Sequence, residues 1–317
     1  MQYGVVLNYN TNNLGDDIQT FAASKLLPRV DEFLDRENLK MSEINEKIKF
    51  ICNGWYMYYP QNWPPAKNLH PLFISFHITN SNNSYRKMVS KDLINYYKKF
   101  EPIGCRDTYT LNLFKAIGIK AYLSGCLTLT LDNPFSKNER NKDIIVVDPF
   151  MFYMKKEFKE HIIKKLVPNS FHKNIKYISH YIKYPLDSIE QRMDYTKNIL
   201  DIYAKAHVVI TSRIHAALPA MALGTPVIFI DLGYNSIKSR SRFGGILELF
   251  NILDNSNLFF TDKSYFSRFY RKLNIYKLYY PMRNFKFEWD NPPPPPREIN
   301  EIANKIKKKV NMFIDFD

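Results

Sequence analysis

Residues 206–230, AHVVITSRIHAALPAMALGTPVIFI, constrain the fold more than any other stretch of the chain. Residues 207–210 are largely apolar and β-branched, which is typical of a parallel strand buried on both faces. Small and apolar residues follow with helical spacing over 214–223, and Gly224 then stands where helices commonly end. Residues 227–230 have the pattern of a second buried strand. This succession of strand, turn, helix and strand predicts an α/β fold with parallel sheets.

Arg213 and His215 lie where the first of these strands is expected to pass into the helix, directly after the capping types Thr211 and Ser212. Ligands of open α/β sheets bind at this carboxyl edge, and helix N-termini favour anions. A guanidinium group binds carboxylate or phosphate in a fixed geometry, and an imidazole can exchange a proton near neutral pH. A structural role also fits, with Arg213 paired to a carboxylate and His215 bonded to a loop carbonyl.

The start of the chain has the same organisation. Residues 4–9 have the pattern of a strand and residues 18–27 that of a helix. Asn13, Gly15 and Asp16 lie in the polar turn between them, again at the carboxyl end of a strand. Acidic residues are also common in the first turn of a helix, so a structural role for the carboxylate stays open.

A third unit of this kind is predicted in the middle of the chain. Short strands are expected over 103–105 and 121–123, with a helix between them. Arg106 follows the first of these strands, and Ser124 and Gly125 form a turn after the second. Arg106 either faces the ligand edge or forms a local ion pair with the aspartate that follows it.

These segments resemble the motifs of the polysaccharide pyruvyl transferase family. The resemblance rests on Gly-Cys-Arg-Asp at 104–107, Ser-Gly-Cys-Leu-Thr-Leu-Thr-Leu at 124–131, Val-Ile-Thr-Ser-Arg-Ile-His-Ala at 209–216 and Ala-Leu-Gly-Thr-Pro-Val-Ile at 222–228. The Asn-x-Gly-Asp turn with which the family opens is matched at 13–16. The motifs follow one another in the family's order and spacing and extend over most of the chain.

The resemblance implies transfer of the enolpyruvyl group of phosphoenolpyruvate to a sugar of a polysaccharide, or of its lipid-linked precursor. The product would be a cyclic pyruvate ketal, with release of phosphate. Arg106, Arg213 and Ser212 are then expected to bind phosphoenolpyruvate, whose carboxylate and phosphate suit two arginine forks. His215 is expected to act as acid or base, and Asp16 is a weaker candidate for activating an acceptor hydroxyl. Further candidates for the site are Asn13, Gly15, Ser124, Gly125 and Arg242. Phosphoenolpyruvate is the donor substrate, and neither a cofactor nor a metal is expected.

Strands alternate with helices in both halves of the chain, which predicts two doubly wound, Rossmann-like domains facing each other across a cleft. The polar segment 132–143 is the expected boundary, with an N-terminal domain at 1–135 and a C-terminal domain at 140–290 that carries the Ser-Arg-x-His motif. A proline-rich linker and a terminal helix over 291–317 are expected to pack back on the body. The family resembles the GT-B architecture of many glycosyltransferases, which agrees with this division.

Several segments are open to two interpretations. The aromatic loop 54–65 either stacks a sugar or packs within the protein, and Arg242 either binds an anion or faces solvent. The aromatic stretch 259–280 suits core packing or contact with lipid, and a helix expected over 246–250 precedes it. The lysine-rich helix 299–313 suits a solvated face or a membrane contact.

The chain carries 45 lysines and arginines against 31 aspartates and glutamates, a formal net charge of +14. This balance suits anionic partners, although a lysine-rich solvated surface explains it equally well. No nucleic-acid motif is visible, so no nucleic-acid partner is expected. The cysteines lack metal or disulfide spacing, the start lacks signal-peptide features, and no apolar run is long enough to span a bilayer. We therefore expect a cytoplasmic protein, with peripheral binding at the inner face of the membrane as an alternative.

Two other functions remain open from the sequence. One is a GT-B glycosyltransferase that uses a nucleotide-sugar donor, because a fold alone does not define a reaction. The other is a non-catalytic basic protein that binds anionic glycans or membrane surfaces, for which the arginine and histidine motifs would be structural. No Gly-x-Gly-x-x-Gly motif, P-loop or metal-spaced His and Cys cluster is present.

Overall fold

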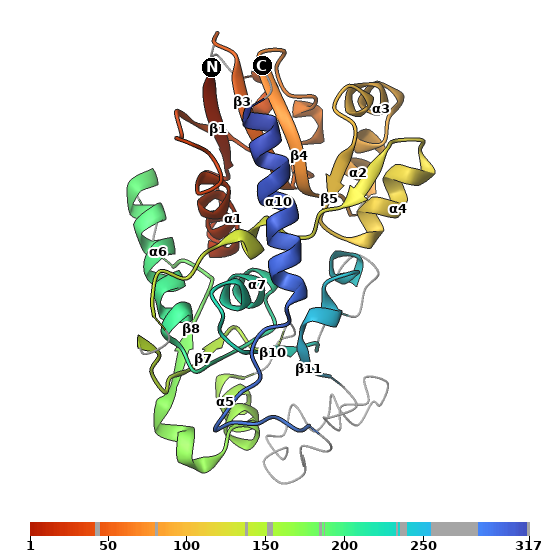
Figure 1. Cartoon of the computed structure of the whole chain (residues 1–317). Helices are drawn as coiled ribbons and strands as arrows, with labels where there is room; N and C mark the ends of the chain where they lie inside the picture. Colours follow the sequence, from red (N-terminus) through yellow and green to blue (C-terminus); the bar gives the residue numbers. More distant parts are fainter. Residues whose placement is uncertain are drawn as a thin grey trace.

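The computed structural model describes most of the chain, namely residues 1–41, 45–79, 82–136, 139–150, 155–183, 186, 188–232, 234, 240–254 and 285–315. Its framework is two parallel β-sheets flanked by helices, as Rossmann-like units are built (Figure 1). The α/β fold with parallel sheets that the sequence predicts is therefore confirmed. Residues 259–280, for which core or lipid contact was expected, lie outside the described residues.

The first sheet has six strands in the order β2-β1-β3-β4-β5-β6, all parallel. The strands are β1 (Gln2–Leu7), β2 (Glu32–Asp35), β3 (Ile48–Trp55), β4 (Leu69–His77), β5 (Ile103–Cys105) and β6 (Ala121–Leu123). The direction of the strand order reverses between β1 and β3. Such a reversal opens a crevice at the carboxyl ends of the two strands.

The second sheet has five strands in the order β11-β10-β9-β7-β8, also all parallel. The strands are β7 (Ile144–Val147), β8 (Ile175–Ile178), β9 (Val208–Thr211), β10 (Val227–Ile230) and β11 (Asn251–Leu253). Here the order reverses between β7 and β9. The strand β9 leads into the Ser-Arg-x-His motif, so the motif lies beside this second crevice.

Helices connect the strands and cover the sheets. They are α1 (Leu14–Ser24), α2 (Asn82–Met88), α3 (Lys91–Lys98), α4 (Thr108–Ala116), α5 (Lys156–Leu166), α6 (Ile189–Lys205), α7 (Ile214–Ala222) and α10 (Glu298–Asp315). Short 3₁₀ turns occur at Leu39–Met41, Pro60–Asn62, Leu127–Thr130, Asn169–Asn174, Ser241–Phe243 and Leu247–Leu249. Among the helices of the described residues, none combines the length and the apolar character needed to cross a membrane.

The local structure departs from the sequence patterns in a few places. Helix α1 begins at Leu14 rather than at residue 18, because the Asn13 side chain accepts the Gly15 N–H and caps the helix. The helix expected over 246–250 is wrong: a short 3₁₀ turn leads there into β11. Strand β2 and helix α2 were not predicted.

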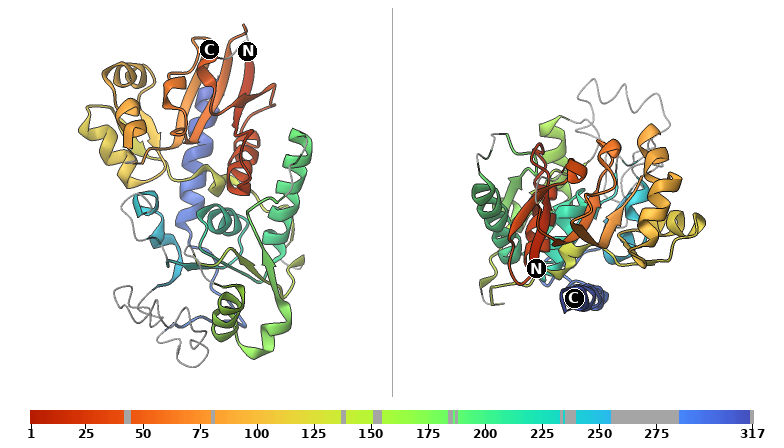
Figure 2. Two further views of the ribbon diagram at one scale, coloured as in Figure 1. Left: turned by 180° about the vertical axis from the view of Figure 1, so that it is seen from behind. Right: turned by 90° about the horizontal axis from the view of Figure 1, so that it is seen from above.

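One continuous hydrophobic core joins the two sheets. Residues of α1, such as Ile18, belong to the same cluster as Ala217 of α7 and Phe229 of β10. Helix α10 contacts β4 and α7, and it runs along the outside of the molecule across both halves (Figures 1 and 2). At its far end, Lys49 of β3 donates a hydrogen bond to the Ile314 carbonyl at 3.3 Å. The two sheets are thereby joined by packed side chains.

Candidate active site

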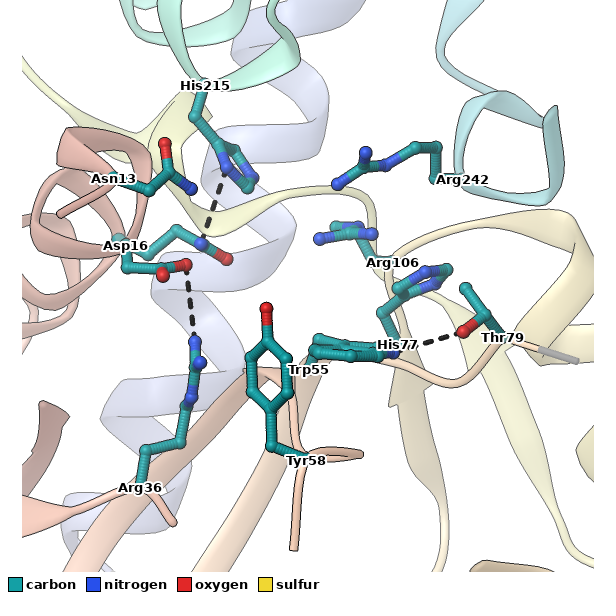
Figure 3. Close-up of a pocket in the computed structure, with 11 residues that line it drawn as sticks. Asn13, Asp16, Arg36, Trp55, Tyr58, His77, Thr79, Arg106, His215 and Arg242 are labelled. Carbon is teal, nitrogen blue, oxygen red and sulfur yellow. Dashed lines mark hydrogen bonds and ion pairs between the residues drawn. The ribbon is translucent and has the colours of Figure 1, made fainter. Parts of the chain in front are cut away.

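A pocket of about 370 Å³ lies where the carboxyl ends of the first sheet meet helix α7 (Figure 3). Side chains from both halves of the chain line it, namely Asn13, Asp16, Gln19, Arg36, Trp55, Tyr58, His77, Thr79, Arg106, His215 and Arg242. The predicted candidates Asn13, Asp16, Arg106, His215 and Arg242, separated by up to 229 residues in the sequence, therefore meet in one cavity.

Two guanidinium groups, of Arg106 and Arg242, lie side by side in this pocket (Figure 3). Arg106 follows β5, and only 2% of its side chain is exposed. Its Nε and Nη2 atoms, like Nε of Arg242, have no hydrogen-bond partner among the described residues. Burial, and next the charge of Arg106, lower the pKa of Arg242. Two neighbouring cations whose nitrogens lack hydrogen-bond partners favour the binding of an anion, because the oxygens of the anion would accept hydrogen bonds from both guanidinium groups.

The local ion pair considered for Arg106 is not its main contact. Asp107 lies 3.8 Å from Arg106 Nε, beyond hydrogen-bond distance. Its carboxylate instead accepts hydrogen bonds from the Thr110 backbone at 2.9 Å, which caps α4, and from His77 at 2.5 Å. The Arg106 guanidinium is thus left to the pocket.

His215 stands in the first turn of α7 and is half-buried, with its Nε2 atom shielded from solvent. Its Nδ1 lies 3.4 Å from Nε2 of Gln19, and the same amide nitrogen lies 3.2 Å from the Gly15 carbonyl. A carbonyl only accepts hydrogen bonds, so the Gln19 atom that faces the ring is a donor and Nδ1 accepts. The proton of the neutral ring is then on Nε2, which has no partner among the described residues.

The pKa of His215 is lowered well below 6.5, first by burial and then by the charges of Arg106 and Arg242. The ring is therefore neutral at pH 7 when the pocket holds no ligand. The proton exchange near neutral pH that the sequence suggests does not describe this unliganded state. An anion between the two arginines would offset their charge and make protonation of His215 easier.

Gly15 and Asp16 belong to the first turn of α1. A Cβ atom on Gly15 would stand 3.0 Å from Cβ and 3.2 Å from Nδ1 of His215, so the absence of a side chain permits the close approach of the ring. Asp16 faces the pocket with its carboxylate held 3.2 Å from Arg36 and 2.9 Å from the Thr11 hydroxyl.

Arg213 and Ser212 do not line the main pocket. Arg213 Nε pairs with Asp148 at 2.5 Å, which is the structural pairing considered from the sequence, and Nη1 donates to Asn13 at 3.4 Å. The Ser212 hydroxyl donates to the Ile230 carbonyl and accepts the Phe150 N–H, both at 2.8 Å. Arg213 lines a smaller adjoining cavity that shares Asn13, His215 and Arg242 with the main pocket.

Ser124 and Gly125 lie on the side of β6 that faces α10. The Ser124 hydroxyl accepts the Ser75 N–H at 2.9 Å and donates to the Cys105 carbonyl at 3.0 Å. Gly125 has a positive φ of 72° and approaches Ile302. Both residues line a separate cavity beside α10, so the structure does not bring them to the pocket.

Sequence reasoning did not select His77, which is the last residue of β4 and has 2% of its side chain exposed. Its position directly after a buried strand was the available signal. Trp55 and Tyr58, from the aromatic loop, also line the pocket, with their ring centroids 4.6 Å apart. The Trp55 indole donates a hydrogen bond to the Thr79 hydroxyl at 3.1 Å, which fixes the ring at the pocket wall.

A metal site is not found in the described part of the chain, where no three His, Cys, Asp or Glu side chains lie close enough to hold an ion. The pocket thus offers an end with two arginines and a histidine, and another with aromatic rings and a carboxylate. The first end can bind an anion and the second a polar ligand with hydroxyl groups.

Comparisons with known proteins identify the family. The chain is similar in structure to a functionally uncharacterised protein from Klebsiella pneumoniae, with 14% sequence identity, a TM-score of 0.43, and coverage of 78% of this chain and 88% of that one. No curated protein matches the chain. The family model for polysaccharide pyruvyl transferase matches residues 13–234, which is more than half of the chain. The chain therefore belongs to the polysaccharide pyruvyl transferase family, a family of transferases with a role in pyruvyl transfer to polysaccharides.

Proposed function

We propose that this protein transfers the enolpyruvyl group of phosphoenolpyruvate to a sugar and closes it into a cyclic pyruvate ketal, with release of phosphate. The observation that carries the proposal is the pair of neighbouring guanidinium groups of Arg106 and Arg242, which have buried nitrogens without a hydrogen-bond partner among the described residues. Phosphoenolpyruvate carries a phosphate and a carboxylate within a few bonds of each other. Two neighbouring arginine forks suit these two groups.

His215 supplies the first proton in this proposal. Binding of the donor places negative charge between the arginines that lower the pKa of His215, so the ring takes up a proton as the donor binds. Protonation of Nδ1 requires the Gln19 amide nitrogen to move away from the ring, because this nitrogen donates to Nδ1 in the unliganded pocket. His215 then protonates the methylene carbon of phosphoenolpyruvate, and an oxocarbenium-like centre develops at C2.

The acceptor sugar occupies the aromatic end of the pocket. Trp55 and Tyr58 present ring surfaces to it, and the Asp16 carboxylate accepts a hydrogen bond from one of its hydroxyls. The second hydroxyl attacks C2 after phosphate leaves, which closes the ketal. Substitution of Trp55 by alanine is expected to raise the KM for the sugar and to leave the affinity for phosphoenolpyruvate unchanged. The opposite pattern would place the sugar elsewhere.

Arg213 is proposed to reach the donor from the adjoining cavity, where it now pairs with Asp148. Arg213→Lys keeps the charge and loses the planar fork. We expect a loss of donor affinity of about 1.5–3 kcal/mol, the scale of a hydrogen bond to a charged group. Isothermal calorimetry measures it, and an unchanged affinity would restrict Arg213 to its ion pair. Ser212 contributes by fixing the backbone beside Arg213.

We further propose a GT-B-like arrangement, with domains at 1–135 and 140–290 and the segment 291–317 packed across them. Small-angle scattering with and without phosphoenolpyruvate tests it, because domain closure would reduce the radius of gyration. The apolar cavity beside α10, whose rim carries Lys305, Lys308 and Lys309, suits a lipid-linked acceptor at the inner face of the membrane. A soluble acceptor used as readily as its lipid-linked form would argue against this location.

The central experiment combines thermal unfolding with a phosphate-release assay. Phosphoenolpyruvate should raise the melting temperature, and phosphate should appear only when a suitable sugar is added from a panel of acceptors. Stabilisation by a nucleotide sugar instead would indicate a glycosyltransferase. Stabilisation by neither ligand would indicate a binding protein without this chemistry.

A further inference from the structure

His77 and Asp107 form a buried pair in the wall of the pocket. The His77 Nδ1 atom lies 2.5 Å from Asp107 Oδ2, and the two side chains are 2% and 0% exposed. The carboxylate is fixed from its other side by the Thr110 backbone N–H at 2.9 Å and the Thr110 hydroxyl at 3.0 Å. The pair joins the last residue of β4 to the N-cap of α4, so it links this helix to the first sheet.

The partners of each ring define its tautomer. A carboxylate only accepts, and the pKa of Asp107 is lowered by His77 and Arg106 against the effect of burial. Nδ1 of His77 is therefore the donor, and the lone pair of the neutral ring is on Nε2. His215 has the opposite tautomer in the unliganded pocket, because its Nδ1 accepts from Gln19. The pocket thus contains one ring with a free lone pair and one with a free N–H.

His77 lines the pocket together with residues of both of its ends. Figure 3 shows the ring near Arg106, which belongs to the end with the two arginines, and near Trp55 and Thr79 of the aromatic end. Burial, and then the charges of Arg106 and Arg242, lower the pKa of His77 to about 4, while Asp107 acts in the opposite direction. The ring is therefore neutral and able to accept a proton at pH 7. Asp16 is less suited to that task, because Arg36, Thr11 and Asn8 already occupy its oxygens.

We propose that His77 is a second catalytic residue, the general base for the attacking sugar hydroxyl, and that Asp107 is the residue that positions it. This inference rests on the proposed function. The bond from the hydroxyl oxygen to C2 forms as its proton moves to Nε2 of His77, while His215 delivers a proton to the methylene carbon. Phosphate then leaves with the C–O electron pair and takes the proton of His77. The second hydroxyl attacks C2 and returns its proton to His215, which restores both rings.

The tautomer can be measured without any substrate. A long-range ¹H–¹⁵N correlation spectrum of the ¹⁵N-labelled protein distinguishes the two neutral forms of each ring, and His77→Asn and His215→Gln each remove one set of signals and so assign them. We expect the proton of His77 on Nδ1 at neutral pH, and on Nε2 in Asp107→Asn. A His77 proton on Nε2 in the natural sequence would overturn the proposal whatever reaction the protein catalyses.

Turnover gives the second test. His77→Asn can still donate to Asp107 but has no base at the Nε2 position, and Asp107→Asn keeps a residue that caps α4 well. Both should lose about 10²–10⁴-fold in kcat, the usual contribution of general base catalysis, with unchanged affinity for phosphoenolpyruvate. The control is His70→Asn, on the same strand but away from the pocket, which should keep full turnover.

The outcomes separate the two proposals. Full turnover in His77→Asn, with normal turnover of the natural sequence, would remove His77 from the mechanism and leave the proposed function standing. No phosphate release by the natural sequence with any acceptor would contradict the proposed function, and the ring spectra would still decide whether His77 has the form of a base.

Discussion

At the scale of the residue, the main feature of the pocket is the positive charge of two neighbouring arginines that are poorly accessible to water. Arg106 and Arg242 both have buried guanidinium nitrogens without a hydrogen-bond partner among the described residues, and burial together with Arg106 lowers the pKa of Arg242. Such an arrangement destabilises the unliganded protein and strengthens binding of an anion, since the ligand removes the repulsion. Stability and function therefore make opposite demands on these side chains.

Arg242→Met tests this opposition directly. The affinity for phosphoenolpyruvate should fall by about 1.5–3 kcal/mol, because hydrogen bonds to a charged group are lost. The melting temperature of the unliganded protein should stay the same or rise, because a repulsive charge has gone from the interior. Calorimetry and thermal unfolding measure the two quantities. Arg240→Met is the matched control, since Arg240 is exposed and pairs with Asp231 outside the pocket. A destabilised Arg242→Met with normal affinity would contradict the assignment.

The pKa of His215 leads to a prediction about protons. In the free protein the pKa is well below 6.5, and the bound donor should raise it. Binding then takes up a proton at any pH between the two values, so donor affinity should fall as pH rises through that range. Calorimetry at one neutral pH in buffers of different ionisation heat reports the uptake. His215→Gln should show none and should lose about 10²–10⁴-fold in turnover. Equal proton uptake by the two proteins would exclude His215 as its origin.

At the scale of the element, the N-terminus of α1 determines where His215 can sit. The helix begins with an Asn13 cap, and Gly15 in its first turn is in contact with the histidine of α7. Two helices from different halves of the chain therefore meet through a position without a side chain. The N-terminus of α1 therefore contributes two things to the pocket: the carboxylate of Asp16, and a position at Gly15 that lets His215 come close to the helix.

Gly15→Ala should separate the effect on function from the effect on stability. The added methyl would stand 3.0 Å from His215 Cβ, so the ring must shift by a few tenths of an ångström. Helix propensity favours alanine over glycine by up to about 1 kcal/mol, which offsets the crowding in the free energy of unfolding. We expect reduced turnover at nearly unchanged stability, by phosphate release and urea denaturation. In the His215→Gln background the same substitution should have little further effect on turnover. A full effect there would mean that Gly15 acts on another group.

At the scale of the whole molecule, the two sheets are held together by their shared core and by a buried ion pair. Arg192 of α6 pairs with Asp17 of α1 and also donates to the Asn8 carbonyl at 2.8 Å. Burial raises the pKa of Asp17 to about 6 despite the attraction of Arg192. The pair fixes the relative position of the helices that lead to the pocket from either half.

Removal of the cation in Arg192→Met should destabilise the protein by about 3–5 kcal/mol, the usual cost of an uncompensated buried charge. Without Arg192 the folded pKa of Asp17 rises further above its unfolded value, near 3.8. The loss should therefore be smaller at pH 5 and larger at pH 8, because the protonated carboxyl is the form that tolerates burial. Urea denaturation at both values measures it. The control Arg29→Met removes an exposed pair and should cost under about 1 kcal/mol at either pH. If the loss of unfolding free energy were the same at both pH values, we would attribute it to lost packing and not to the charge of Asp17.

Much of the architecture was predictable from the sequence, because strand and helix periodicity are local properties. The expected strands at 103–105, 121–123 and 227–230 are observed with those bounds. The placement of Arg106 and His215 at strand ends followed from the same alternation, since parallel strands present their carboxyl ends at one edge. A polar residue directly after a buried strand can be recognised from the local sequence alone, without knowing which residues lie beside it in the fold.

The tertiary structure alone decided which side chains share the pocket and in what state. Arg213 is only two residues from His215 in sequence, yet it pairs with Asp148, while Ser124 and Gly125 face α10. His77 meets Asp107 from thirty residues away, and Trp55 joins them from an aromatic loop that the sequence left open. The direction of a side chain, its desolvation and its protonation depend on neighbours that are distant in the chain. The periodicity of a sequence carries no information about those neighbours, so the low pKa of His215 and the tautomer of His77 follow only from the folded arrangement.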